Sequence, residues 1–87
     1  EQMLPLEAVM VFPNPVNTGV LHAQLRSDQP GMIKQLELFD QAGRLVDSYA
    51  PNARSGQLNA SALPAGLYLL KVKTDKGLQV MKIQATR

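Results

Sequence analysis

The chain has no cysteine and no tryptophan, and it has a single histidine. The absence of cysteine excludes disulfide frameworks, thiolate zinc sites and cysteine nucleophiles. A catalytic histidine usually needs an orienting carboxylate, and a metal site needs several ligands. His22 alternates with apolar residues and lies beside Gln24 and Arg26, with no acidic neighbour. We therefore expect His22 to be a solvated residue on a strand.

Other arrangements that carry chemistry are also missing. No serine sits in a Gly-x-Ser-x-Gly elbow, and the acidic residues are scattered singly instead of clustering as Asp-x-Asp for calcium. The glycines are spaced as turn residues and form no phosphate cradle. The sequence therefore predicts no catalytic residue, no metal site and no cofactor, and we expect the chain not to be an enzyme.

Long apolar runs and aromatic residues are scarce. No run approaches the roughly 20 residues that span a bilayer, so no membrane-spanning segment is expected. Aromatic residues make up 5% of the chain, and we expect most of them to be needed for packing. A single-stranded nucleic acid would require exposed aromatics interleaved with basic residues. Nucleic acid is therefore not an expected partner.

What the chain does contain is many short alternating runs separated by turn residues. Its 87 residues suffice for one domain with a thin core. The alternation predicts strands at about residues 8–12, 21–26, 32–40, 44–49, 57–61, 67–74 and 78–84. Turns every 8 to 12 residues favour an all-β, immunoglobulin-like antiparallel β-sandwich of about seven strands with Greek-key connections.

Tyr68 follows a Pro/Gly corner at the start of a predicted strand. There, a buried tyrosine ring can donate its hydroxyl back to the preceding connection, which is the tyrosine-corner arrangement of Greek-key sandwiches. The alternative is that Tyr68 is simply a core residue. Both interpretations place the ring inside.

Charge is unevenly distributed along the chain. Up to Gly66 there are four basic and six acidic residues, whereas from Leu67 onward there are five basic residues and Asp75 alone. The C-terminal segment therefore carries +4 on a body of −2, which sums to the overall +2. Its lysines could be a solvated edge that discourages strand aggregation. They could instead attract an anionic partner.

Four stretches resemble the C-terminal sorting domain of the type IX (Por) secretion system of Bacteroidetes secreted proteins, in its type A form. They are VFPNP at 11–15, LELFDQAGRLV at 36–46, LNASALPAGLY at 58–68 and the terminal strand at 77–83. Order and spacing match over residues 9–84. Phe12 stands where the family more usually has tyrosine, and Asn59 where it has aspartate.

The resemblance implies that residues 8–87 are a sorting domain and that residues 1–7 are the end of a linker from an upstream cargo domain. The outer-membrane translocon would recognise the domain and export the cargo. An outer-membrane sortase would then remove the domain and anchor the cargo at the cell surface. The expected route leads through the periplasm to the outer membrane.

Two sets of site residues follow from the motifs. The first sets the fold and comprises Pro13, Asn14, Pro15, Asp40, Gly43, Arg44, Leu63, Gly66 and Tyr68. The second is a recognition hypothesis on the terminal hairpin and comprises Lys71, Lys73, Lys82, Gly77 and Ile83. Strand addition to an exposed edge of this hairpin is one expected docking mode.

Two rival functions stay open at this point. One is a carbohydrate-binding or adhesive immunoglobulin-like module on a secreted hydrolase, which would need a platform of exposed aromatics. The other is a passive spacer, which would tolerate a position in the middle of a protein.

Overall fold

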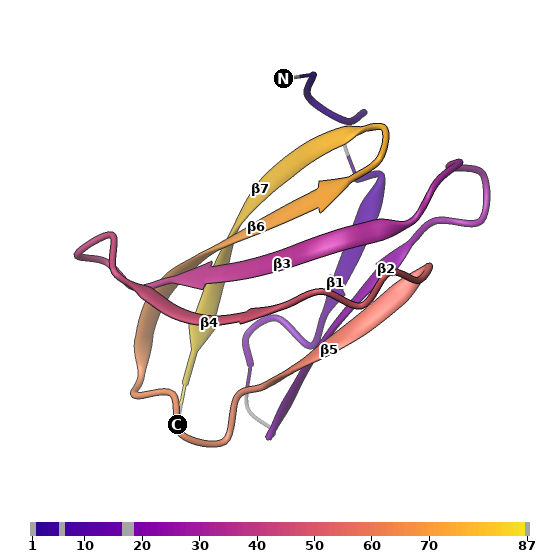
Figure 1. The fold of residues 1–87 in the computed structure, drawn as a ribbon. Helices are drawn as coiled ribbons and strands as arrows, with labels where there is room; N and C mark the ends of the chain where they lie inside the picture. Colours follow the sequence, from indigo (N-terminus) through magenta and orange to yellow (C-terminus); the bar gives the residue numbers. More distant parts are fainter. Residues whose placement is uncertain (1, 6, 17–18, 87) are drawn as a thin grey trace.

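The structure, a computed structural model, describes residues 2–5, 7–16 and 19–86. Within these residues the chain forms seven β-strands and no helix (Figure 1). The strands are β1 (Val9–Phe12), β2 (Val20–Leu25), β3 (Ile33–Phe39), β4 (Leu45–Tyr49), β5 (Ser55–Asn59), β6 (Gly66–Thr74) and β7 (Gly77–Ala85). In the described part, accordingly, there is no helix that could cross a membrane.

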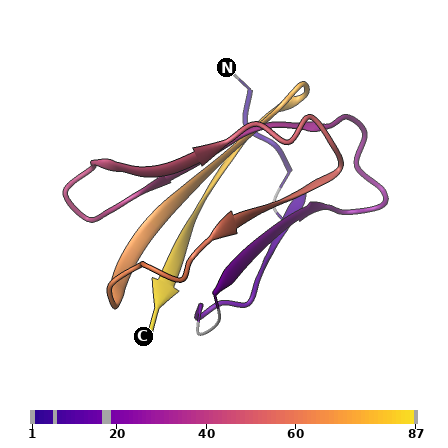
Figure 2. The same ribbon diagram turned by 60° about the horizontal axis from the view of Figure 1, so that its bottom comes forward.

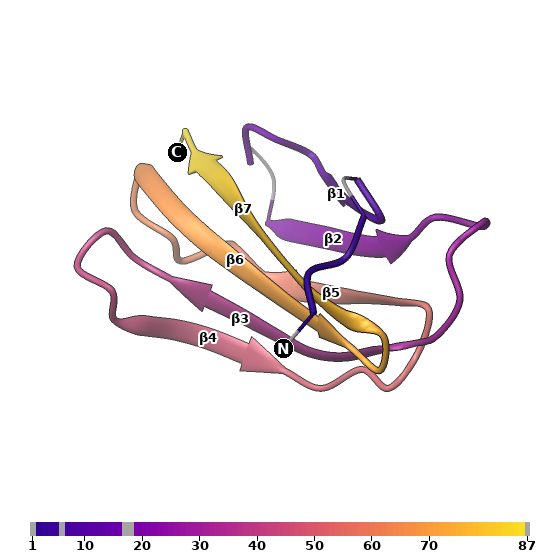
Figure 3. The same cartoon turned by 90° about the horizontal axis from the view of Figure 1, so that it is seen from above.

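The strands form two antiparallel sheets that pack face to face. One sheet has the order β1-β2-β5 and the other β4-β3-β6-β7. The chain passes from the first sheet to the second after β2, returns for β5 and crosses again to β6. Figures 2 and 3 show the two layers from two further sides, with the β3–β4 hairpin projecting at one end. This arrangement confirms the predicted immunoglobulin-like sandwich.

The core lies between the sheets and follows the predicted alternation. On β2 the inward side chains are Leu21, Ala23 and Leu25, each at most 2% exposed. On β3 they are Leu36 and Leu38, each 1% exposed. Because successive side chains on a strand point to opposite faces, each strand gives one row of apolar residues to the core and one to the outside.

The fifth strand begins earlier than predicted. The expected strand at 57–61 lies at Ser55–Asn59, because β2 pairs its Ala23 with Gly56 and its Gln24 with Ser55. Serine and glycine have low strand propensity, so their pairing is decided by the neighbouring strand. The strand ends where the Asn59 side chain accepts a hydrogen bond from the N–H of Ser61 at 3.0 Å.

The expectation that most aromatics serve packing was wrong for two of the four. Phe12 is 44% exposed and Tyr49 is 50% exposed. Phe12 stacks on His22 with ring centroids 5.1 Å apart, on the outer side of the β1-β2-β5 sheet. His22 is therefore only half-buried, in a stack on the protein surface.

A glutamine side chain joins the two sheets where β1 passes β7. The Gln79 amide accepts a hydrogen bond from the N–H of Val9 at 3.1 Å and donates one to the Val9 carbonyl at 3.2 Å. The side chain thus pairs with β1 as a backbone peptide would. It satisfies polar groups of Val9, a residue that is only 3% exposed.

Candidate functional site

The β3–β4 hairpin is held by the carboxylate of Asp40. This carboxylate accepts hydrogen bonds from the N–H groups of Ala42 at 2.9 Å and Arg44 at 3.0 Å. The Arg44 guanidinium donates to its other oxygen at 3.0 Å. The hydrogen bond from the Arg44 N–H keeps the pKa of Asp40 below its ordinary value of 3.8. In the Asp-x-x-Gly-Arg motif, both oxygens of the Asp40 carboxylate therefore accept hydrogen bonds from within the turn itself.

Tyr68 forms the predicted corner at the start of β6. Its hydroxyl donates to the carbonyl oxygen of Pro64 at 2.6 Å, and the residue is 7% exposed. Leu63, from the same segment, packs in the core at 8% exposure. The tyrosine-corner interpretation is thus confirmed, and it includes the core role that was its alternative.

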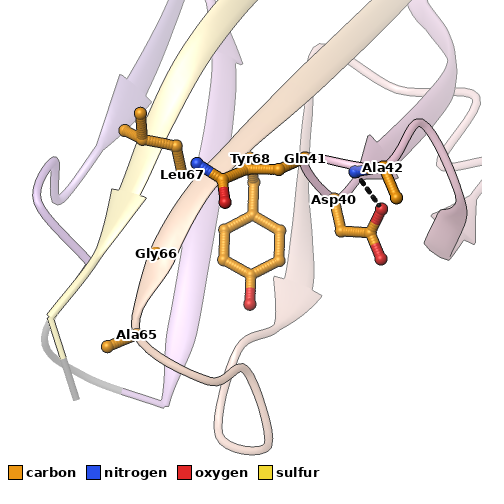
Figure 4. A pocket seen from close by; sticks show the side chains of 7 residues that line it. All are labelled: Asp40, Gln41, Ala42, Ala65, Gly66, Leu67 and Tyr68. Atoms are coloured by element: carbon orange, nitrogen blue, oxygen red, sulfur yellow. Dashed lines mark hydrogen bonds between the residues drawn. The ribbon is translucent and has the colours of Figure 1, made fainter.

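The hairpin and the corner face each other across a shallow hollow. One part of it has a volume of about 190 Å³ and is lined by Asp40, Gln41, Ala42, Ala65, Gly66, Leu67 and Tyr68 (Figure 4). An adjoining part of about 380 Å³ extends to Gly43, Leu69 and Lys82. Residues from three of the four motif stretches therefore meet at one end of the larger sheet, although they are far apart in the sequence.

The three recognition lysines share the outer face of the β4-β3-β6-β7 sheet. The register pairs Lys71 with Val80, Leu69 with Lys82 and Lys73 with Leu78. Since Tyr68, Leu70 and Val72 point into the core, the intervening β6 residues point outward. We call this surface the basic face: Lys71, Lys73 and Lys82 with the outward apolar residues of the same two strands.

The apolar part of the basic face was not predicted. Leu67, Leu69 and Val80 are 45%, 43% and 45% exposed. The signal was present in the sequence, because Leu67 and Leu69 alternate with residues that had been assigned to the core. Their outward orientation makes the face amphipathic instead of merely charged.

The other two recognition residues lie elsewhere. The Ile83 side chain is fully buried in the core. Gly77 is the first residue of β7 and lies against the backbone of Gln2. The five residues therefore do not form one surface, and of them only the lysines present accessible side chains on a common face. Direct contact of any of the five with a partner stays a prediction.

The Pro-Asn-Pro motif docks on the last strand. The Asn14 side-chain amide donates to the carbonyl of Lys82 at 3.2 Å and accepts from the N–H of Gln84 at 3.2 Å. The N–H of Val16, just beyond Pro15, donates to the Gln84 carbonyl at 2.6 Å. Because Pro13 and Pro15 have no N–H to pair, the asparagine side chain makes these bonds. The first and last motifs of the chain are thereby joined.

These contacts correct the expected docking mode. The outer edge of β7 is occupied at its C-terminal end by Asn14 and Val16, and at its start by residues 2–4. An incoming strand would have to displace them. The prediction that the terminal hairpin offers an exposed edge is therefore wrong for β7, whereas its outer face is accessible.

Metal-ligating side chains are not clustered in the described residues: no group of three or more could hold an ion. Ion pairs among the residues that the structure describes link Arg26 with Asp28 at 3.1 Å and Arg44 with Asp40 at 3.0 Å, and both are local in the sequence. The chemistry available at the basic face is accordingly binding by ammonium groups and apolar contact.

Comparison with known proteins gives a consistent result. The family model described as "Secretion system C-terminal sorting domain" matches residues 10–85. The match begins in β1 and ends at the last residue of β7, so it spans both sheets. No curated protein matches the chain. From the family match, the chain belongs to the C-terminal sorting domains of the type IX secretion system.

Proposed function

We propose that this domain directs a larger cargo protein through the type IX outer-membrane translocon and is then removed by a sortase that anchors the cargo at the cell surface. The observation that carries the proposal is the family match over residues 10–85. Removal breaks one peptide bond ahead of the domain. The acyl carbon of the cargo passes to water or to an amine nucleophile, and the domain leaves with a new amino terminus.

The basic face is the surface that we assign to recognition by this machinery. Lys82 lies beside Leu69 and Lys71 beside Val80, and both of these apolar side chains are nearly half-exposed. A partner surface with apolar residues flanked by carboxylates would remove those side chains from water and pair the charges. The lysines would also raise the rate of encounter with an acidic partner.

Deleting β7 is a poor test of this proposal. It would remove Leu78, Ile83 and Ala85, which are 8%, 0% and 4% exposed, together with the pairing partner of β6. The remaining chain would lose its core, so loss of export would not distinguish recognition from unfolding.

Substitutions on the surface distinguish a loss of recognition from unfolding. The chain would be fused behind a periplasmic reporter and expressed in a cell with a type IX system. The test variant carries Lys71→Gln, Lys73→Gln and Lys82→Gln. The control carries Gln24→Glu, Gln57→Glu and Asn59→Asp, which change the net charge equally on the other sheet.

We expect the unmodified and control fusions to reach the cell surface, and the lysine variant to be retained in the periplasm. We expect the amount of reporter at the cell surface to fall at least about tenfold. A tenfold loss of affinity corresponds to about 1.4 kcal/mol of binding free energy. Export of the lysine variant at the normal level would refute the assignment of the basic face. Retention of the unmodified fusion would refute the sorting function itself.

A carbohydrate-binding role has one observation in its favour. Phe12, stacked on His22, lies exposed near the amides of Gln24 and Gln57 on the outer side of the smaller sheet. Aromatic rings beside amides are able to bind sugars. Retention of the domain by an insoluble polysaccharide, lost on Phe12→Ala, would support this alternative over the sorting function.

A further inference from the structure

The N-terminal residues Gln2, Met3 and Leu4 run alongside the start of β7, and we call them the N-terminal strap. The N–H of Leu78 donates to the carbonyl of Gln2 at 2.9 Å, and the N–H of Leu4 donates to the carbonyl of Leu78 at 2.8 Å. Met3 forms a parallel bridge with Leu78. Figures 1 and 3 both show this segment beside the β6–β7 turn.

Gly77 makes this close approach possible. A Cβ at position 77 would overlap the carbonyl oxygen of Gln2 and approach the Leu4 side chain to 3.3 Å. The backbone of Gly77 also has φ +153°. Gly66 has nearly the same conformation, with φ +149°, but a Cβ there would have nothing within 4 Å. The two glycines therefore differ in whether the strap lies over them.

Burial on β7 shows where the strap lies. Leu78, Val80 and Lys82 alternate along the outer face of the strand. Val80 is 45% exposed and Lys82 is exposed, yet Leu78 is only 8% exposed. The strap pairs with Leu78 and not with the other two, and the burial of Leu78 is consistent with this contact. Leu4 in turn packs against the edge of the core.

The chain is anchored again shortly after the strap. Ala8 is fully buried, its N–H donates to the Pro5 carbonyl at 3.1 Å, and its carbonyl accepts from Arg26 at 3.0 Å. Leu4 and Ala8 are thus both held to the body of the domain, on either side of Pro5.

We propose that the N-terminal strap sets the boundary of proteolytic removal: the peptide bonds at Gln2–Leu4 are protected by pairing with β7, and the cut that releases the domain falls ahead of Gln2. Extended peptides commonly bind proteins by pairing their backbone groups, and here the Gln2 carbonyl and the Leu4 N–H are already paired with Leu78 of β7. Hydrolysis of the cut bond adds the water hydroxyl to the carbonyl carbon and its proton to the amine. The cut belongs to the proposed function, but the protection rests on the strap contacts alone.

Limited digestion tests the proposal without any secretion apparatus. The whole chain is fused behind a folded reporter through a Gly/Ser linker containing leucines. Thermolysin, which cuts ahead of apolar residues, could attack this linker as well as the strap bond preceding Met3. Mass spectrometry then identifies each new amino terminus over time.

In the unmodified fusion, we expect the linker to be cut at least about tenfold faster than the strap bond, because cutting the strap requires local opening. Gly77→Ala should remove most of that difference, whereas Gly66→Ala, with the matching backbone strain, should retain it. Equal cutting of strap and linker in the unmodified fusion would overturn the proposal. So would equal effects of the two alanine variants.

Hydrogen exchange keeps the test decisive if Gly77→Ala fails to fold. In the unmodified chain, the Leu4 and Leu78 amides should exchange at least about tenfold more slowly than the exposed amide of Met3. Exchange of all three at the same rate would show that the strap is not docked. A reporter that is protected in this way but never exported would refute the sorting function and leave the strap intact.

Discussion

Side chains complete the backbone hydrogen bonding at several ends of strands in this domain. Gln79 pairs with Val9, Asn14 pairs with β7, and the Tyr68 hydroxyl satisfies the carbonyl of Pro64. A hydrogen bond of this kind contributes about 0.5–1.5 kcal/mol, so the part-buried bonds of Gln79 and Tyr68 stabilise the fold beyond the packing of these side chains. At this scale the motif residues act first as structural elements.

Tyr68→Phe isolates one such contribution. It removes the hydroxyl and keeps the ring, so we expect the free energy of unfolding to fall by about 1 kcal/mol. Urea denaturation followed by circular dichroism measures the change. Tyr49→Phe is the matched control, since Tyr49 is 50% exposed, and it should change stability by no more than about 0.5 kcal/mol. Equal effects of the two substitutions would contradict the role of the corner.

Among the elements, β4 is an edge strand that carries three exposed apolar residues. It ends the β4-β3-β6-β7 sheet, and Leu45, Val46 and Tyr49 are 49%, 40% and 50% exposed. Such an edge invites pairing with another chain. The carboxylate of Asp47 accepts a hydrogen bond from the N–H of Ser48 at 2.8 Å and so occupies a donor of this strand. We infer that Asp47 protects the edge.

Asp47→Val should therefore promote association through β4. The substitution removes both the charge and the acceptor and raises strand propensity. We expect dimers or larger species at concentrations on the order of 100 µM, measured by analytical ultracentrifugation. Asp47→Asn retains an oxygen acceptor for Ser48 and should stay monomeric. A monomeric valine variant would show that β4 needs no such protection.

Across the whole molecule, carboxylates in three turns between strands accept hydrogen bonds, and that of Asp75 joins two separate loops. Asp28 is held by the Arg26 side chain, Asp40 by the N–H of Arg44, and Asp75 by the N–H of Met32. Each of these bonds lowers the pKa of its carboxyl below the ordinary 3.8. The unfolded chain therefore binds protons at a higher pH than the folded one.

The sign of the pH dependence follows from these directions. The stabilisation by the three carboxylates is present above pH 3.8 and is lost as the pH falls through their lower folded values. We expect the urea midpoint to be nearly level from pH 7 to about pH 5 and to decline steeply below about pH 4. Asp75→Asn should make that decline shallower. An unchanged acid limb in this variant would show that Asp75 is not one of the groups responsible.

Local patterns in the sequence were sufficient for much of the fold. The alternation of Leu21, Ala23 and Leu25 predicted which face of β2 is buried, because the period of a strand depends only on adjacent residues. The Asp40 turn and the Tyr68 corner were predictable for the same reason, since each closes within four residues. The basic face was predicted in part, as its lysines alternate with core residues.

Contacts between distant segments were not predictable in this way. The bonds from Gln79 to Val9 and from Asn14 to Lys82 join residues 70 and 68 positions apart. They exist because two sheets pack with β1 beside β7, and nothing in the local pattern specifies that approach. The start of β5 at Ser55 was missed because the neighbouring strand imposed it.

The strand pattern, the turns, the lack of any cysteine chemistry and the family could all be recognised from the order of the residues. Which surfaces are free depends instead on how the two sheets pack. The folded chain closes the β7 edge with the strap and Asn14, leaves the basic face open, and exposes Phe12 and Tyr49. The physical reason is that solvent exposure depends on which segments meet across the two layers, and those segments lie far apart along the chain.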